Sequence, residues 1–120
     1  MEAFEKVIEA VKALDSKKAF DIQVIKIDSV SSLGDYLVIA SGGSTTQVRT
    51  LADEVEFRLS QLGEEPHHVE GRVTGWIVLD YLSVMVHVFL PKQREFYALS
   101  HMWQDGEDVD VTEYLEEGRE

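Results

Sequence analysis

The spacing of apolar residues along the chain predicts an alternation of helices and strands. Apolar positions recur every three or four residues over 4–14 and 48–62, which is the period of an amphipathic helix. Short runs rich in β-branched and aromatic residues predict strands over 20–27, 36–40, 68–70, 76–79 and 84–90. A further helical pattern follows Pro91, with Phe96, Leu99 and Trp103 on one face. The order α-β-β-α-β-β-β-α predicts an α/β fold (α+β mixed), with a mixed sheet of about five strands flanked by three helices.

Two strand pairs have hairpin spacing. The runs 76–79 and 84–90 are apolar at nearly every position, which is typical of central strands covered on both faces, and a short turn joins them. The runs 20–27 and 36–40 predict a second antiparallel hairpin. Alternation slips inside 20–27, so we expect an irregular strand at the edge of the sheet. The strand 68–70 follows 36–40 after a helix, so we expect these two to run parallel.

The second helix has clear end signals. Ser44 and Gln47 have the spacing of a capping box, and Gly63 stands where a helix ends in a left-handed residue. A glycine turn before a helix also invites a phosphate-binding interpretation, because free N–H groups there face an anion. We interpret Gly43 and Ser44 instead as a turn that joins a strand to a capped helix, because neither a Walker lysine nor a dinucleotide fingerprint follows.

Charge divides the chain. The net charge of −12 over 120 residues is concentrated in 104–120, which hold eight acids and one arginine. We therefore expect a folded domain over 1–103 and a mobile, solvated acidic tail over 104–120, whose removal leaves the fold intact. The acidic body argues against a surface for sequence-specific nucleic-acid binding and suits a basic protein partner. We expect no membrane partner and no membrane span.

Two separated blocks carry a resemblance to a known family. The first reads D-Y-L-V-I-A-S-G-G-S-T-T-Q-V-R from Asp35, and the second runs from G-W-I-V-L-D-Y through V-M-V-H-V-F to R-E-F-Y-A-L and a closing M-W. In order and spacing they resemble the ribosomal silencing factor family (RsfS, also called Iojap), over about 4–103. Leu82 and Ser83 depart from the family's usual Gly-Asp, and Ser100 from its usual Glu.

The resemblance implies a binding protein rather than an enzyme, with no cofactor and no metal. Such factors bind the large ribosomal subunit through ribosomal protein uL14 at the intersubunit face. They block association with the small subunit and repress translation in the cytoplasm. Apart from the resemblance, the sequence leaves open whether an edge strand pairs with a second copy to make a homodimer. The resemblance also implies a nucleotidyltransferase-like fold without the metal site, and fold alone does not imply function.

The same resemblance implies partner-binding residues: Trp76, Val78 and Asp80 on one strand, with Arg94 and Tyr97 on the following helix. Alternation puts the first three on one face of their strand. Trp76 and Tyr97 would bury apolar area, and Asp80 would accept hydrogen bonds from a basic partner. A competing interpretation makes Trp76 a core residue, covered by the last helix. The sequence leaves both interpretations open.

An enzyme alternative starts at the Gly43–Ser44 turn, which matches the opening of the nucleotidyltransferase pattern. That pattern needs two acids one residue apart on a strand to hold Mg²⁺, and Glu54 and Glu56 have the spacing. They lie in a helix, however, where such residues point about 200° apart. His67 and His68 lack further ligands at metal-binding spacing, and His87 in an apolar strand is more typical of a hydrogen-bonded core residue than of a catalytic base.

Overall fold

The protein is represented by a computed structural model that describes residues 1–28, 34–71, 75–93 and 106–115. The elements are α1 (Ala3–Ser16), β1 (Phe20–Lys26), β2 (Tyr36–Ser41), α2 (Thr45–Gln61), β3 (His68–Glu70), β4 (Trp76–Asp80), β5 (Val84–Phe89), β6 (Glu107–Val109) and the 3₁₀ turn η1 (Thr112–Tyr114). Residues 91–93 are helical, as the pattern after Pro91 predicts. The remainder of that predicted helix lies outside the described residues.

The strands form one mixed sheet in the order β3-β4-β5-β2-β1-β6. Both predicted hairpins are present, because β1 pairs antiparallel with β2 and β4 pairs antiparallel with β5. The parallel neighbour of β2 is β5. β3 runs in the same direction as β2, as expected, but β4 and β5 lie between them. The mixed α/β architecture predicted from the pattern is therefore confirmed.

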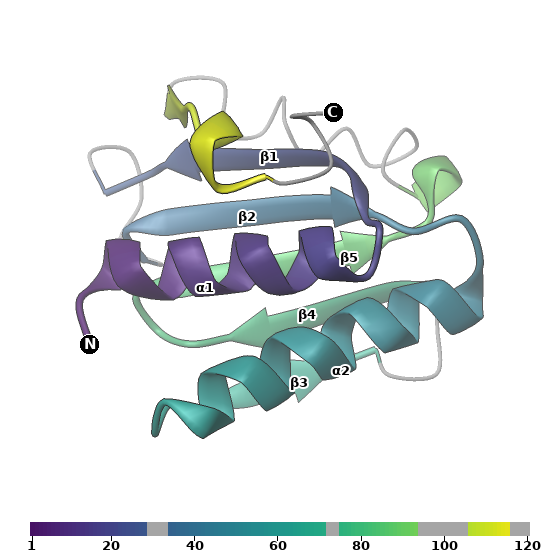
Figure 1. Cartoon of the computed structure of the whole chain (residues 1–120), viewed down its shortest axis with the longest axis horizontal. Coiled ribbons are helices and arrows are strands. Elements are labelled where there is room, and N and C mark those ends of the chain that lie inside the picture. The colour runs from purple at the N-terminus through teal and green to yellow at the C-terminus, as the bar shows by residue number, and fades with distance from the viewer. Residues whose placement is uncertain (29–33, 72–74, 94–105, 116–120) are drawn as a thin grey trace.

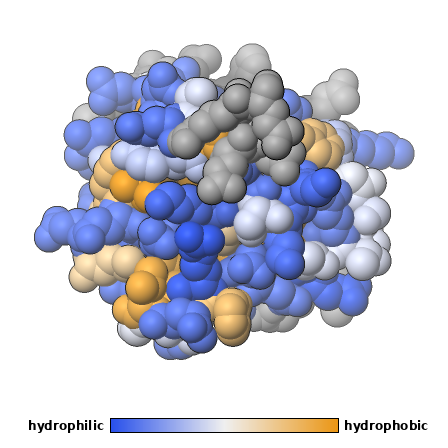
Figure 2. Space-filling model, in the orientation of Figure 1, coloured by the Kyte–Doolittle hydropathy of each residue, from blue (hydrophilic) through white to orange (hydrophobic). Residues whose placement is uncertain are grey.

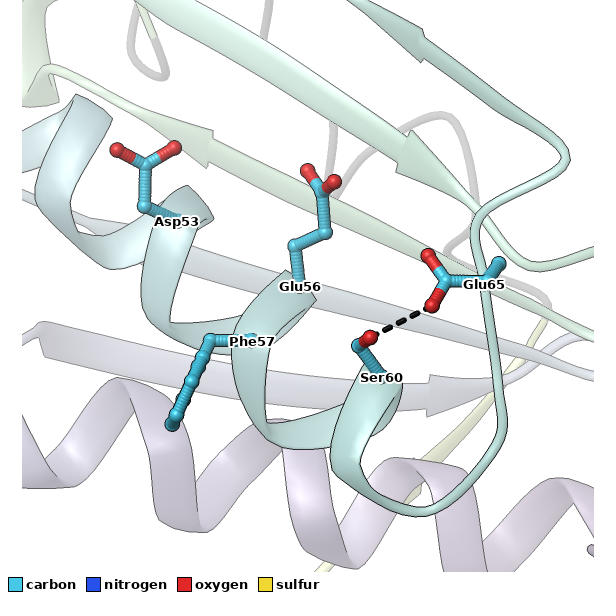
Figure 3. A pocket seen from close by; sticks show the side chains of 5 residues that line it. All are labelled: Asp53, Glu56, Phe57, Ser60 and Glu65. Carbon is cyan, nitrogen blue, oxygen red and sulfur yellow. Dashed lines mark hydrogen bonds between the residues drawn. The ribbon is translucent and has the colours of Figure 1, made fainter.

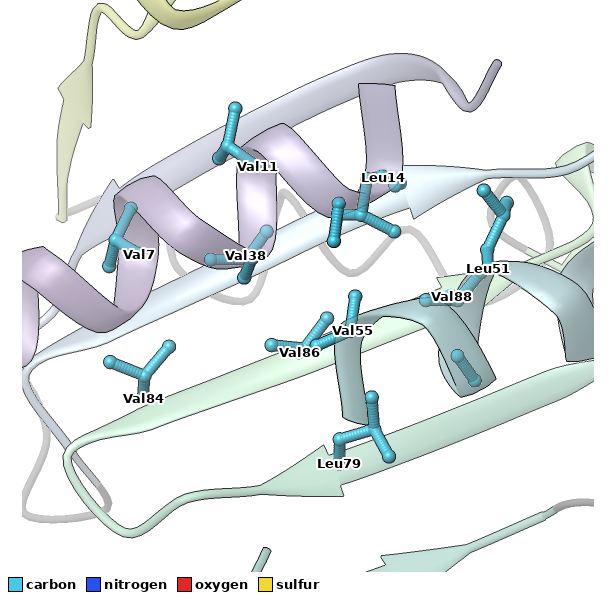
Figure 4. Packing of buried hydrophobic residues seen from close by; sticks show 14 of the residues in the cluster. Val7, Val11, Leu14, Val38, Leu51, Val55, Leu79, Val84, Val86 and Val88 are labelled. Carbon is cyan, nitrogen blue, oxygen red and sulfur yellow. The ribbon is translucent and has the colours of Figure 1, made fainter. Parts of the chain in front are cut away.

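The two long helices cover the same face of the sheet (Figure 1). Their apolar stripes pack on alternate residues of the central strands, including Val38, Val86 and Val88, which are fully buried (Figure 4). The outer surface of this helical layer is mostly hydrophilic, with small hydrophobic patches (Figure 2). The helices thus bury one side of the sheet and present a polar surface to water.

The opposite face of the sheet holds a second, smaller core. Its buried members are Ile25, Ile27, Leu37, Ile39 and Phe89, and Trp76 and Met85 pack against them while partly exposed. Residues on successive strand positions point to opposite faces, so β1, β2 and β5 contribute to both cores. This explains why β2 and β5 are apolar at nearly every position and why β1 is apolar at the consecutive positions Val24 and Ile25.

β1 has the predicted irregularity but not the predicted position. Its register shifts between Phe20 and Gln23, where Asp21 adopts a positive φ of 50°. The expectation that this strand forms the sheet edge is wrong, because β6 pairs antiparallel with its outer side. The pairing satisfies backbone N–H and C=O groups that an edge strand would leave to water.

β6 belongs to the segment expected to be a solvated tail, and it raises the number of strands to six. Beyond it, Val111 is buried in the main core, with 5% of its surface exposed. The ring of Tyr114 lies 6.4 Å from that of Phe4 on α1. The expectation of a solvated segment is therefore wrong for 106–115, which pack on both β1 and α1. The division of the chain at residue 103 stays a prediction.

None of the helices that the structure describes is long and apolar enough to cross a membrane.

Candidate functional site

The structure puts Trp76, Val78 and Asp80 together on the face of β4 that points away from α1 and α2. The intervening Ile77 and Leu79 are fully buried in the core beneath the helices. Trp76, Val78 and Asp80 are all partly exposed. The alternation expected from the sequence is thus realised, and it separates a buried row from a partly open one.

The pairing of β4 with β5 extends this row into a surface. Directly opposite residues are Trp76 and Phe89, Val78 and His87, and Asp80 and Met85. We call Trp76, Val78, Asp80, Met85 and His87 the β4 face. Sequence spacing did not indicate which β5 residue stands beside which β4 residue, because the hairpin turn and the ladder register decide it.

Trp76 is held by two residues of β5, His87 and Phe89. Its indole N–H donates a hydrogen bond to Nδ1 of His87, with 3.0 Å between the nitrogens. Its ring centroid lies 5.7 Å from that of Phe89 and 6.0 Å from that of His87. Trp76 therefore packs on the second core while it stays partly exposed, and its part in partner binding stays a prediction.

His87 is a neutral acceptor in this arrangement. Burial lowers the pKa of His87 from 6.5 to about 4, so the imidazole is uncharged at neutral pH. A ring nitrogen that accepts from the indole cannot carry a proton, which places the single proton of His87 on Nε2. The residue thus orients Trp76, as a hydrogen-bonded histidine in an apolar strand is expected to do.

Asp80 ends β4 and shapes the turn to β5. Its Oδ1 accepts a hydrogen bond from the backbone N–H of Leu82 at 2.8 Å. Leu82 has a positive φ of 67°, and Ser83 N–H donates to the carbonyl of Tyr81 at 2.8 Å. Leu82 thus holds a left-handed conformation at the position where the family resemblance implies glycine, and its Cβ makes that conformation strained.

Arg94 and Tyr97 lie outside the described residues. Their part in the β4 face stays a prediction.

The Gly43–Ser44 turn is hydrogen-bonded to neighbouring parts of its own chain. Gln47 N–H donates to Oγ of Ser44 at 3.1 Å, so Ser44 caps α2 as expected, but Oε1 of Gln47 accepts from Gly43 N–H at 2.6 Å rather than from the Ser44 N–H of a full capping box. Gly42 N–H donates to the carbonyl of Phe89 at 3.1 Å. Three N–H groups around this turn are therefore already satisfied, and the turn connects β2 to α2 as expected.

The two acids of the enzyme alternative point to different surroundings. Glu54 pairs with Lys17 at 4.0 Å, near the end of α1. Glu56 lines a shallow hollow on the outer side of α2 with Asp53, Phe57, Ser60 and Glu65 (Figure 3). Ser60 Oγ donates to Oε1 of Glu65 at 2.6 Å across its rim. Within the described ranges, no three histidine, aspartate or glutamate side chains group so that they could hold a metal ion.

Comparison with known proteins shows the family of this chain. The family model described as "Ribosomal silencing factor during starvation" matches residues 1–120. The chain belongs to the ribosomal silencing factor family. The family carries the general role of a ribosome-associated regulator of translation.

Relatives in bacteria support this membership. The chain is 35% identical over 99 residues to the ribosomal silencing factor RsfS of Zymomonas mobilis, covering 82% of this chain and 74% of that protein. It is 32% identical over 103 residues to RsfS of Bacillus subtilis, covering 85% and 87%. The resemblance inferred from the two sequence blocks is confirmed.

Solved structures agree on the fold. A crystal structure from Chromobacterium violaceum aligns with a TM-score of 0.85 and 32% identity, covering 87% of this chain and 88% of that one. A second, from Bacillus halodurans, aligns with a TM-score of 0.80 and 30% identity, covering 90% and 99%.

Proposed function

We propose that this silencing factor binds the large ribosomal subunit through ribosomal protein uL14 at the intersubunit face. Bound there, it excludes the small subunit sterically and so represses translation in the cytoplasm. The observation that carries the proposal is the β4 face, where Trp76, Val78 and Asp80 point together, partly exposed, on the side of the sheet away from both long helices. Arg94 and Tyr97 are included from the family resemblance.

The β4 face has the composition of a protein-binding surface. Tryptophan is enriched among residues whose truncation weakens interfaces most, because it buries a large area with little conformational freedom to lose. Trp76 is already oriented by His87, so partner binding need not fix it. The carboxylate of Asp80, at the other end of the same strand face, suits a Lys or Arg of a basic ribosomal protein. The net charge of −12 also favours encounter with such a partner.

The proposed activity requires no chemistry. Steric exclusion needs only a stable domain of sufficient size at the right place, and the described part of the chain has a Cα radius of gyration of 13.0 Å. The competing proposal of a nucleotide-binding enzyme at Gly43–Ser44 is less favoured, because Gly43 N–H and Gln47 N–H are engaged locally and Glu54 and Glu56 point apart. We therefore propose a binding protein that is not an enzyme.

Order of addition tests the function. Stoichiometric protein added to separated subunits before mixing should reduce joined ribosomes in a sucrose-gradient profile. The same protein added after joining should do far less, because the small subunit then occupies the site. An unchanged profile at several-fold molar excess and low salt would contradict the proposal.

Two substitutions test the β4 face. Trp76→Ala should weaken large-subunit binding by about 2 kcal/mol or more, the loss expected of an interface anchor. Asp80→Asn keeps an acceptor for Leu82 N–H and removes only the charge, so it should weaken binding without unfolding the turn. Glu113→Gln, an exposed acid on η1, is the matched control and should bind like the wild type. Melting curves by circular dichroism separate lost binding from lost folding.

A further inference from the structure

Strand β3 carries two exposed polar side chains onto the same side of the sheet as the β4 face. In the antiparallel pairing of β3 with β4, His68 lies opposite Asp80 and Glu70 lies opposite Val78. Directly opposite residues of a ladder point to the same face. The side chains of His68 and Glu70 are 61% and 69% exposed. The β4 face therefore continues across β3 to the end of the sheet.

The ladder gives these groups a definite arrangement. Glu70 is opposite Val78, and Asp80 is the next residue of β4 on that face, so Glu70 and Asp80 are diagonal neighbours. Diagonal neighbours in an antiparallel pair are about 7–8 Å apart, within reach of one long side chain. Val78, partly exposed, lies beside both acids. The result is an apolar position flanked by two carboxylates from different strands.

His68 fixes one of the two carboxylates. Its Nε2 lies 2.7 Å from Oε1 of Glu70 on the same strand. Asp80 is fixed separately, because its Oδ1 accepts from Leu82 N–H at 2.8 Å. Each acid is thus oriented by a contact that uses one oxygen of its carboxylate. An exposed pair such as His68 and Glu70 adds little to the free energy of folding. A contribution to stability therefore does not explain why the two side chains are paired.

We propose that Glu70 and Asp80 together accept one basic side chain of the ribosomal protein partner, with His68 as a positioning residue for Glu70. The inference rests on the proposed ribosome binding and names the chemistry of its recognition. An arginine fits best, because its planar guanidinium donates in two directions and its methylene stem can lie on Val78. The family resemblance assigns no partner-binding residue to β3. The proposal makes β3 part of the docking surface.

Binding to isolated large subunits at two salt concentrations tests the assignment. Glu70→Gln should weaken binding about fivefold at low salt and reduce the salt dependence, because one charge contact is lost. Glu65→Gln is the matched control: it removes an exposed acid five residues away, on the α2 side of the molecule, and should stay within about twofold of wild type.

A double-mutant cycle tests whether the two acids share one cation. If they do, Glu70→Gln combined with Asp80→Asn should lose clearly less than the product of the two single losses. Multiplicative losses would show that each acid meets a different group and would overturn the shared site. His68→Ala should weaken binding about threefold, and His68→Gln, which can still donate to Glu70, should restore it. Unchanged binding of His68→Ala would remove the role given to His68.

The outcomes separate this inference from the proposed function. If wild-type protein does not bind large subunits, both are wrong. If wild type binds and Asp80→Asn weakens binding, but Glu70→Gln matches Glu65→Gln, the ribosome proposal stands and the β3 contact is wrong. Melting temperatures within about 2 °C of wild type confirm that each variant is folded, as expected for exposed substitutions.

Discussion

Val111 offers a direct test of whether the acidic segment after residue 105 is part of the fold. Its side chain is 5% exposed and belongs to the main core, although it follows a three-residue strand in a highly charged stretch. Val111→Ala removes two buried methyl groups from that core. At about 0.8 kcal/mol for each buried carbon, the loss in unfolding free energy is about 1.5 kcal/mol, before any cavity term.

This loss converts into a measurable change of melting temperature. Unfolding entropies of about 2.1 cal/mol/K per residue give about 0.25 kcal/mol/K for a chain of 120 residues, so Val111→Ala should melt about 6 °C below wild type. Differential scanning calorimetry or circular dichroism at pH 7 measures the shift. Removing residues 106–120 should lower the melting temperature further, because the backbone pairing of β6 with β1 is lost as well.

The matched control is Glu113→Ala, an exposed substitution two residues away that should move the melting temperature by less than 2 °C. If Val111→Ala behaves like this control, the segment contributes nothing to the core. The expectation of a solvated tail would then be right after all.

Three further predictions concern the β4 face, its turn and the α2 cap. Because burial lowers the pKa of His87 below its unfolded value, stability should fall as pH drops from about 6.5 toward 4, where the unfolded chain binds the proton that the folded chain excludes. In urea titrations, the free energy of unfolding of the wild type should fall between pH 7 and 4.5 by about 2 kcal/mol more than that of His87→Gln. Equal losses in the two proteins would refute this. Leu82→Gly should raise stability by about 0.5–1 kcal/mol, because glycine takes the positive φ without strain and Leu82 is 61% exposed; a lower melting temperature would contradict it. Gln47→Ala should lower the free energy of unfolding by about 1 kcal/mol, because it leaves Gly43 N–H without its acceptor. Calorimetry should detect no micromolar binding of Mg²⁺-nucleotide to this variant or to the wild type.

Much of the fold follows from local sequence pattern. The helices over Ala3–Ser16 and Thr45–Gln61, the cap at Ser44 and both hairpins are signalled within a few residues by periodicity, capping chemistry and turn residues. These signals are reliable where they agree with one another over a whole element. Alternation also sufficed to put Trp76, Val78 and Asp80 on one face, because the strand period is fixed at two.

The tertiary structure decided what depends on partners distant in the chain. Nothing local marks Glu107–Val109 as a strand, since two of its three residues are acids; it forms because the outer side of β1, some eighty residues earlier, needs backbone partners. The same holds for the hydrogen bond between Trp76 and His87 and for Glu70 beside Val78, which require the register of the sheet. Sequence fixes the period of each strand, but register is set by the free energy of packing all strands together, and only the folded chain contains that information.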